Sequence, residues 1–213
     1  MNKKLMRATA FATALAITAS VTPLSAYAAP AKYSSVEQGY ITPVKNQGQW
    51  GICWAFTSTA ISEASLIKEF PDKFKADTLD LSENLLSYMI SHPSLYGKLN
   101  SSGDYATYTA SSATDYLDLG GNVWNAGLAV MNGIGPYYEN SQYPYSSYGT
   151  PGIVNKSFTE SEYYELRNSG AAKLTGMYVA DINQNNSNDQ LKELILTHGA
   201  ASLSYCDTTN YGR

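Results

Sequence analysis

The sequence predicts an α+β fold in which a helical part comes first and a β-rich part has only begun when the chain ends at Arg213. The first observation is a helical period of apolar residues downstream of Cys53. This stripe comprises Phe56, Ala60, Ala64 and Ile67, with Glu63 and Lys68 off it. The second is Ser82, a predicted N-cap ahead of another apolar helix. The third is a pair of apolar segments, 172–182 and 200–205, that predict strands.

The rest of the chain divides into segments marked by glycine, proline and polar residues. Phe70 and Pro71 end the first helix. The other expected segments are extended chain over 29–50, a loop over 92–114, a helix over 124–131, irregular chain over 135–158 and a short amphipathic helix over 190–197.

The first 28 residues have the layout of a secretory signal peptide. Basic residues come first, an apolar run over 8–21 follows, and small residues surround Ala28. The run is too short for a membrane span, which needs roughly 20 apolar residues. We therefore expect cleavage after Ala28 and a secreted or cell-surface protein. The formal net charge of −4 gives no electrostatic reason to bind nucleic acid.

Three parts are expected on this basis: a signal peptide over 1–28, a helical lobe over 29–168 and the start of a β-rich lobe over 169–213. The two cysteines, Cys53 and Cys206, could form a disulfide in an exported protein. Their neighbourhoods argue against it, because Cys53 lies in a special motif and Cys206 ends an apolar stretch.

The motif that carries chemistry is PVKNQGQWGICWAF, residues 43–56. A cysteine in the first turn of a helix faces unpaired backbone N–H groups, which favour the thiolate, the nucleophilic form. Gly51 allows close approach of the backbone just before it. Gln47, six residues upstream, could fold back so that its amide and the N–H of Cys53 bind one developing oxyanion.

This segment resembles the nucleophile motif of papain-like cysteine peptidases of the secreted bacterial type. The family pattern is glutamine, glycine, two variable residues, glycine, a small residue and Cys-Trp-Ala-Phe, and here it reads QGQWGICWAF. The resemblance implies that Cys53 is the nucleophile and Gln47 the oxyanion donor. The alternative is a buried core cysteine, with Gln47 an ordinary loop residue.

Three later segments are similar to the same family in the same order, so the resemblance extends over about residues 38–205. Residues 81–85 resemble its second-helix opening, 120–122 its glycine pair and 143–145 its Tyr-Pro-Tyr turn. The resemblance implies a two-lobe fold, helical and then β-rich. It also implies that Gly120 and Gly121, with Gly51 beside the nucleophile, bind an extended peptide substrate.

The sequence departs from many relatives at a bridged pair of cysteines. Those positions are Trp50 and Asp118, so both halves of the bridge are absent together. We expect the loop before Cys53 to be held by packing of Trp50 instead.

The resemblance implies a catalytic histidine and an asparagine that orients it. His198 lies 145 residues after Cys53, within the family's separation, and is a possible base. Its context instead resembles the segment that precedes the catalytic histidine, and His92 sits in a loop. No Asn-Ser-Trp-Gly segment occurs. The expectation is an incomplete chain that lacks the catalytic His and Asn and is inactive alone.

The predicted function is peptide hydrolysis through a Cys53 thioester, with peptide or protein substrates and no metal or cofactor. The alternative is an inactive papain-fold protein that binds partners in the secreted or surface environment. Another acyl transfer by the same thiolate also stays open.

Overall fold

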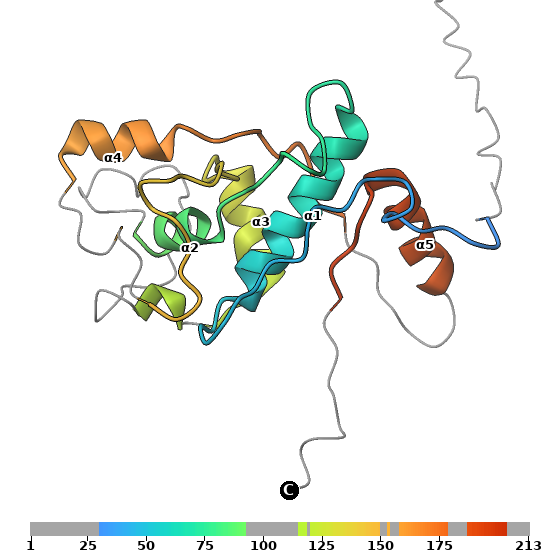
Figure 1. The fold of residues 1–213 in the computed structure, drawn as a ribbon, viewed down its shortest axis with the longest axis horizontal. Coiled ribbons are helices and arrows are strands. Elements are labelled where there is room, and N and C mark those ends of the chain that lie inside the picture. The colour runs from blue at the N-terminus through green and yellow to red at the C-terminus, as the bar shows by residue number, and fades with distance from the viewer. Residues whose placement is uncertain are drawn as a thin grey trace, which may run out of the picture.

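The computed structural model describes residues 30–92, 115–118, 120–149, 153, 158–178 and 187–203 (Figure 1). The predicted signal peptide over 1–28, most of the predicted loop over 92–114 and Cys206 lie outside them. The described helices are α1 (Cys53–Glu69), α2 (Glu83–Ser91), a short 3-10 helix (Asp115–Leu117), α3 (Val123–Met131), α4 (Glu160–Arg167) and α5 (Ser187–His198).

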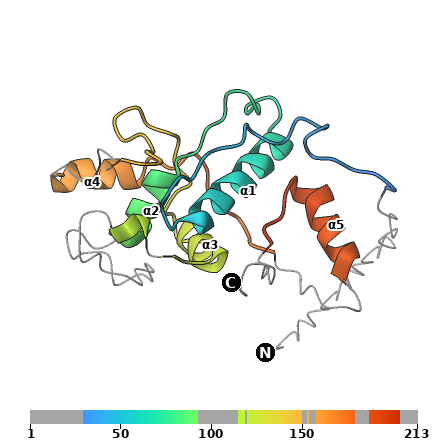
Figure 2. The same cartoon turned by 60° about the horizontal axis from the view of Figure 1, so that its bottom comes forward.

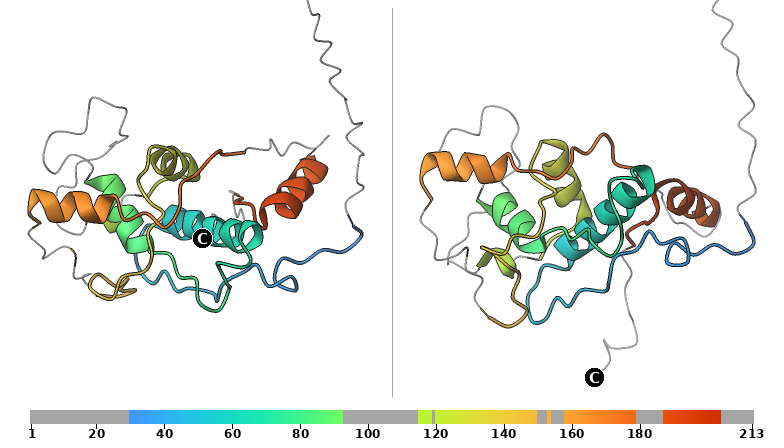
Figure 3. Two further views of the ribbon diagram at one scale, coloured as in Figure 1. Left: turned by 90° about the horizontal axis from the view of Figure 1, so that it is seen from above. Right: turned by 45° about the horizontal axis from the view of Figure 1, so that its top comes forward.

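Helix α1 runs through the middle of the structure and contacts α2, α3 and α5 (Figures 1 and 2). Helix α4 lies beyond α2 at one end, and α5 lies at the opposite end, as the further views agree (Figure 3). The main core is enclosed by α1, α2 and α3. Its fully buried side chains include Ile52, Leu85, Met89, Ala129 and Tyr137.

Helix α1 begins and ends where the sequence predicts, at Cys53 and before Phe70. Its buried face differs from the predicted stripe, because Ala60 is exposed and Glu63 is only 1% exposed. Glu63 is tolerated inside because its carboxylate accepts hydrogen bonds from Lys45 Nζ at 2.9 Å and from the N–H of Leu81 at 2.7 Å. The assignment of Glu63 to the outer face was therefore wrong.

Helices α2 and α3 confirm their predictions. Ser82 caps α2 by accepting from the N–H of Leu85 at 3.2 Å, and Gly133 follows α3 with a φ of +83°. Helix α4 was not predicted, although the sequence carries its signal. Thr159 and Glu162 form a capping box in which each side chain bonds the other residue's backbone N–H.

Strands are nearly absent from the part of the chain that the structure describes. It contains two isolated bridges, Leu81 with Tyr138 and Tyr137 with Gly170. The predicted strands at 172–182 and 200–205 are not formed over 172–178 and 200–203, the portions described. A strand needs a hydrogen-bonded neighbour, and these segments have none within the described residues. The helical first lobe of the predicted fold is confirmed.

Helix α5 contains the predicted short helix and begins three residues earlier, at Ser187. Within the described residues, no helix has both the length and the apolar character that crossing a membrane requires.

Candidate active site around Cys53

Cys53 is the first residue of α1 and carries a free, exposed thiol. Its neighbours Ile52 and Trp54 are buried in the core, which fixes the start of the helix while Cys53 stays outside. The first helical hydrogen bonds run from the N–H groups of Ala55 and Phe56 to the carbonyl of Ile52. The earlier N–H groups of α1 therefore have no partner within the helix, as at any helix start.

Gln47 lies on the loop that approaches α1. Gly48 turns this loop with a φ of +65°, a conformation that favours glycine. The side-chain amide of Gln47 folds back and donates one hydrogen bond to the carbonyl of Trp50. A primary amide has two N–H donors, so one remains for a ligand. The amide therefore folds back toward the residues just before Cys53, and its role as an oxyanion donor stays a prediction.

The glycine pair, Gly120 and Gly121, lies beside Gly51, two residues before Cys53. The N–H of Gly120 donates to the carbonyl of Gly51 at 3.1 Å. Gly120 and Gly121 are both exposed and have φ values of +61° and +151°. The three residues predicted to bind substrate are therefore brought together, and the substrate-binding role itself stays a prediction.

Trp50 anchors the loop before Cys53, as expected from the absence of the cysteine bridge. Its ring packs against the main core cluster, and its indole N–H donates to the carbonyl of Ser146 at 2.8 Å. Asp118, at the position of the other lost cysteine, lies against Gly51 so closely that a Cβ there would be 2.8 Å from Oδ1. The predicted anchoring by Trp50 is confirmed.

The two histidines of the sequence, His92 and His198, lie away from Cys53. His198 stacks on Tyr178 with ring centroids 4.6 Å apart. The next residue, Gly199, packs against Ala64, which is eleven residues beyond Cys53 and about 16 Å along the helix. His92 stacks on Tyr88 at 4.1 Å. Neither histidine makes a hydrogen bond or ring contact with Cys53 in the described part of the chain.

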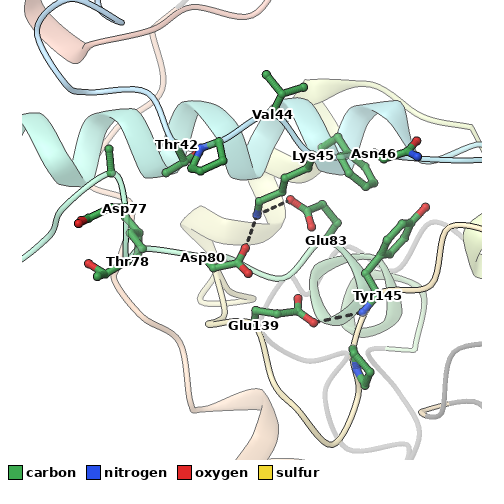
Figure 4. Close-up of a pocket in the computed structure, with 15 residues that line it drawn as sticks. Thr42, Val44, Lys45, Asn46, Asp77, Thr78, Asp80, Glu83, Glu139 and Tyr145 are labelled. Carbon is green, nitrogen blue, oxygen red and sulfur yellow. Dashed lines mark hydrogen bonds and ion pairs between the residues drawn. The ribbon is translucent and has the colours of Figure 1, made fainter.

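Sequence reasoning missed a charged cavity of about 420 Å³ lined by the nucleophile loop and the turn before α2 (Figure 4). In it, Lys45 Nζ lies 2.6 Å from Asp80, 2.9 Å from Glu83 and 2.9 Å from Glu63. The available signal was Lys45 itself, a cation inside an otherwise uncharged motif.

The electrostatics of this cluster are set by burial and pairing. Burial alone would lower the pKa of Lys45, but the charge of Glu83 and bonds to Asp80 and Glu63 outweigh burial and raise it. Burial raises the pKa of Glu83, opposed by Lys45 and by the hydroxyl of Thr59. The cluster joins the loop before Cys53 to both α1 and α2.

Comparison with known proteins shows what the first part of this lobe is similar to. Residues 29–87 match the family model described as papain family cysteine protease. The chain is similar to cathepsin K of Mus musculus, with 58% identity over 33 residues, 16% of this chain and 10% of that protein. It is also similar to cathepsin K of Gallus gallus, with 41% identity over 64 residues, 30% of this chain and 18% of that protein.

The matches thus span a tenth to a fifth of the length of these curated relatives. The matched residues 29–87 include Gln47, Cys53 and the start of α2. The resemblance to papain-like cysteine peptidases is confirmed for this segment.

Proposed function

We propose that the protein is a cysteine-type peptidase and that Cys53 is its nucleophile. The observation that carries the proposal is a free, exposed thiol at the first position of a helix that packs into the core, with the Gln47 amide folded back onto the carbonyl of Trp50. The match of residues 29–87 to papain family cysteine proteases supports it.

In the proposed reaction the Cys53 thiolate attacks the carbonyl carbon of a peptide bond, and the carbonyl oxygen becomes an oxyanion. The N–H of Cys53 and the free N–H of Gln47 stabilise that charge. Collapse expels the amine, which takes up a proton, and leaves a thioester that water hydrolyses to the acid. Gly51, Gly120 and Gly121 would hold the substrate backbone in extended form.

The reaction also needs a general base that accepts the thiol proton and later protonates the leaving amine. We propose that this base is not His198, since its neighbours are Tyr178 and the distal part of α1. The same observation favours a second candidate function. Without a histidine at Cys53, the lobe would act as an inactive papain-fold binding protein. Under either proposal, we infer that the N-terminal segment directs secretion of the protein.

A labelling experiment on the full chain tests the proposed nucleophile. We expect a peptidyl vinyl sulfone to add one equivalent to Cys53 faster, relative to iodoacetamide, than it adds to a free cysteine. Cys53→Ser should abolish the adduct, while Cys206→Ser, the matched control for the other cysteine, should keep it. Equal labelling of both cysteines at the rate of a free thiol would contradict the proposal.

Hydrolysis of internally quenched peptides distinguishes the two functions. Cleavage that Cys53→Ser abolishes supports the peptidase. If His198→Ala removes that cleavage as well, our placement of the base is wrong. Selective labelling of Cys53 without any cleavage by the full protein would favour the binding protein.

A further inference from the structure

We propose that Tyr145 is a positioning residue for the oxyanion donor Gln47, an inference that rests on the proposed function. The Tyr145 hydroxyl donates a hydrogen bond to the carbonyl oxygen of Gln47. The Tyr145 ring meets the ring of Phe56 edge to face, with centroids 5.0 Å apart and an interplanar angle of 77°. One side chain therefore joins the loop that carries Gln47 to the helix that carries Cys53.

The residues after Tyr145 hold the same loop on both sides of Gln47. The Ser147 hydroxyl donates to the carbonyl of Asn46 at 2.8 Å, and the N–H of Gln49 donates to the carbonyl of Ser147 at 3.1 Å. The two segments are packed so closely that a Cβ added at Gly48 would lie 2.2 Å from the carbonyl oxygen of Ser147. The backbone on either side of Gln47 is thus tied to a segment far away in sequence.

The backbone of Tyr145 is held by Glu139. Its N–H donates to the Glu139 carboxylate at 3.1 Å, and its ring extends from there toward the segment that carries Asn46 (Figure 4). Burial, with a smaller contribution from the charge of Glu83, raises the pKa of Tyr145 to about 12. The phenol therefore stays protonated and remains a donor at neutral pH.

The position of the Gln47 main chain matters because an oxyanion donor acts only over a narrow range of distances. One amide N–H of Gln47 is bonded to the carbonyl of Trp50. The position of the second N–H therefore depends on where the backbone of Gln47 lies. A hydrogen bond that holds the carbonyl of Gln47 also holds its Cα, from which the side chain extends. Loss of the Tyr145 hydroxyl should let the donor drift, and small displacements cost rate steeply.

Two reactions of Cys53 separate this role from a merely structural one. A p-nitrophenyl ester of an N-acyl amino acid acylates the thiolate: sulfur attacks the carbonyl carbon, an oxyanion forms, and p-nitrophenolate leaves with the bonding electron pair. This leaving group needs no proton, so the step does not require a general acid. Iodoacetamide alkylates the same thiolate with loss of iodide and forms no oxyanion. The ratio of the two rates cancels differences in the reactivity of the thiolate, so a variant that changes only oxyanion stabilisation changes this ratio.

In the full chain we expect this ratio to exceed that of a free cysteine and to fall roughly three- to tenfold in Tyr145→Phe. The alkylation rate should change less than twofold, since the Phe56 contact survives. Tyr143→Phe, two residues away, is the matched control and should leave the ratio unchanged. In the Gln47→Ala background, Tyr145→Phe should have no further effect, because the donor it positions is gone. Ser147→Ala provides a second variant should Tyr145→Phe fold poorly, with a smaller fall expected.

The outcomes keep the two proposals apart. A wild-type ratio equal to that of a free cysteine removes the oxyanion site and overturns the proposed function together with this inference. A raised ratio that Gln47→Ala lowers but Tyr145→Phe leaves unchanged overturns the inference alone. Equal losses from Tyr145→Phe with and without Gln47 would also overturn it, since Tyr145 would then act independently of the donor.

Discussion

The indole ring of Trp54 lies directly against the main chain of Gly121: a Cβ atom added to that glycine would stand 2.7 Å from Cδ1 of the ring. Trp54 is 5% exposed and cannot swing out of the core to make room. The residue after the candidate nucleophile therefore limits what can occupy the second position of the glycine pair.

Gly121→Ala should destabilise the protein more than Gly120→Ala. Both glycines have positive φ, which disfavours a side chain by about 1–2 kcal/mol. A Cβ at Gly120 meets nothing within 4 Å, whereas at Gly121 it meets Trp54, and overpacking adds about 1–3 kcal/mol. Urea denaturation of the two variants measures the difference. Equal losses of stability would show that Trp54 does not restrict this position.

Lys45→Met should be strongly destabilising. It leaves the carboxylates of Glu63 and Glu83, 1% and 3% exposed, without their ammonium partner. Breaking a buried pair from one side costs about 3–5 kcal/mol. Lys32→Met, which removes the exposed Lys32–Glu37 pair, is the control and should change the free energy of unfolding by less than about 1 kcal/mol. Comparable losses of unfolding free energy in both variants would show that the Lys45 cluster does not stabilise the fold.

His92 should make the folded state sensitive to acid. Burial lowers the pKa of His92, opposed by the bond of its ring nitrogen to the Tyr88 carbonyl. The folded state then binds fewer protons than the unfolded state between the lowered pKa of folded His92 and about 6.5, the usual histidine pKa. Stability contributed by neutral His92 is therefore lost as the pH falls through that window.

His92→Phe keeps a ring to stack on Tyr88 and removes the titration. We expect its unfolding free energy to fall less than that of the wild type between pH 7.5 and pH 5, whatever its absolute stability. Chemical denaturation at several pH values measures the two slopes. Parallel slopes would mean that His92 does not contribute to the acid response.

Trp50→Phe should weaken the anchoring of the nucleophile loop. The variant keeps an aromatic ring on the core but loses the donor to the Ser146 carbonyl, at a cost of about 1 kcal/mol. Trp124, 49% exposed on α3, provides the matched control as Trp124→Phe and should be nearly neutral. Thermal or urea denaturation compares them, and an equal effect at both tryptophans would argue against the anchor.

Local signals in the sequence were sufficient for both ends of α1 and for the start of α2. Cys53 and Phe70 bound α1, and Ser82 caps α2, because caps, glycines and prolines act on their immediate neighbours. The capping box of α4 was equally local and could have been found. Periodicity failed at Glu63, since whether a charge can be buried depends on partners from other segments, here Lys45 and the Leu81 backbone.

By itself, the sequence determined the candidate nucleophile, its place at a helix start and the resemblance of its motif, because these depend on residues close together in the chain. Only the tertiary structure decided what holds that motif. Trp50 and Gln47 are tied to residues 145–147, nearly a hundred positions away, and contacts over such distances depend on how the whole chain packs. The surroundings of His198 were decided in the same way, by its stacking on Tyr178.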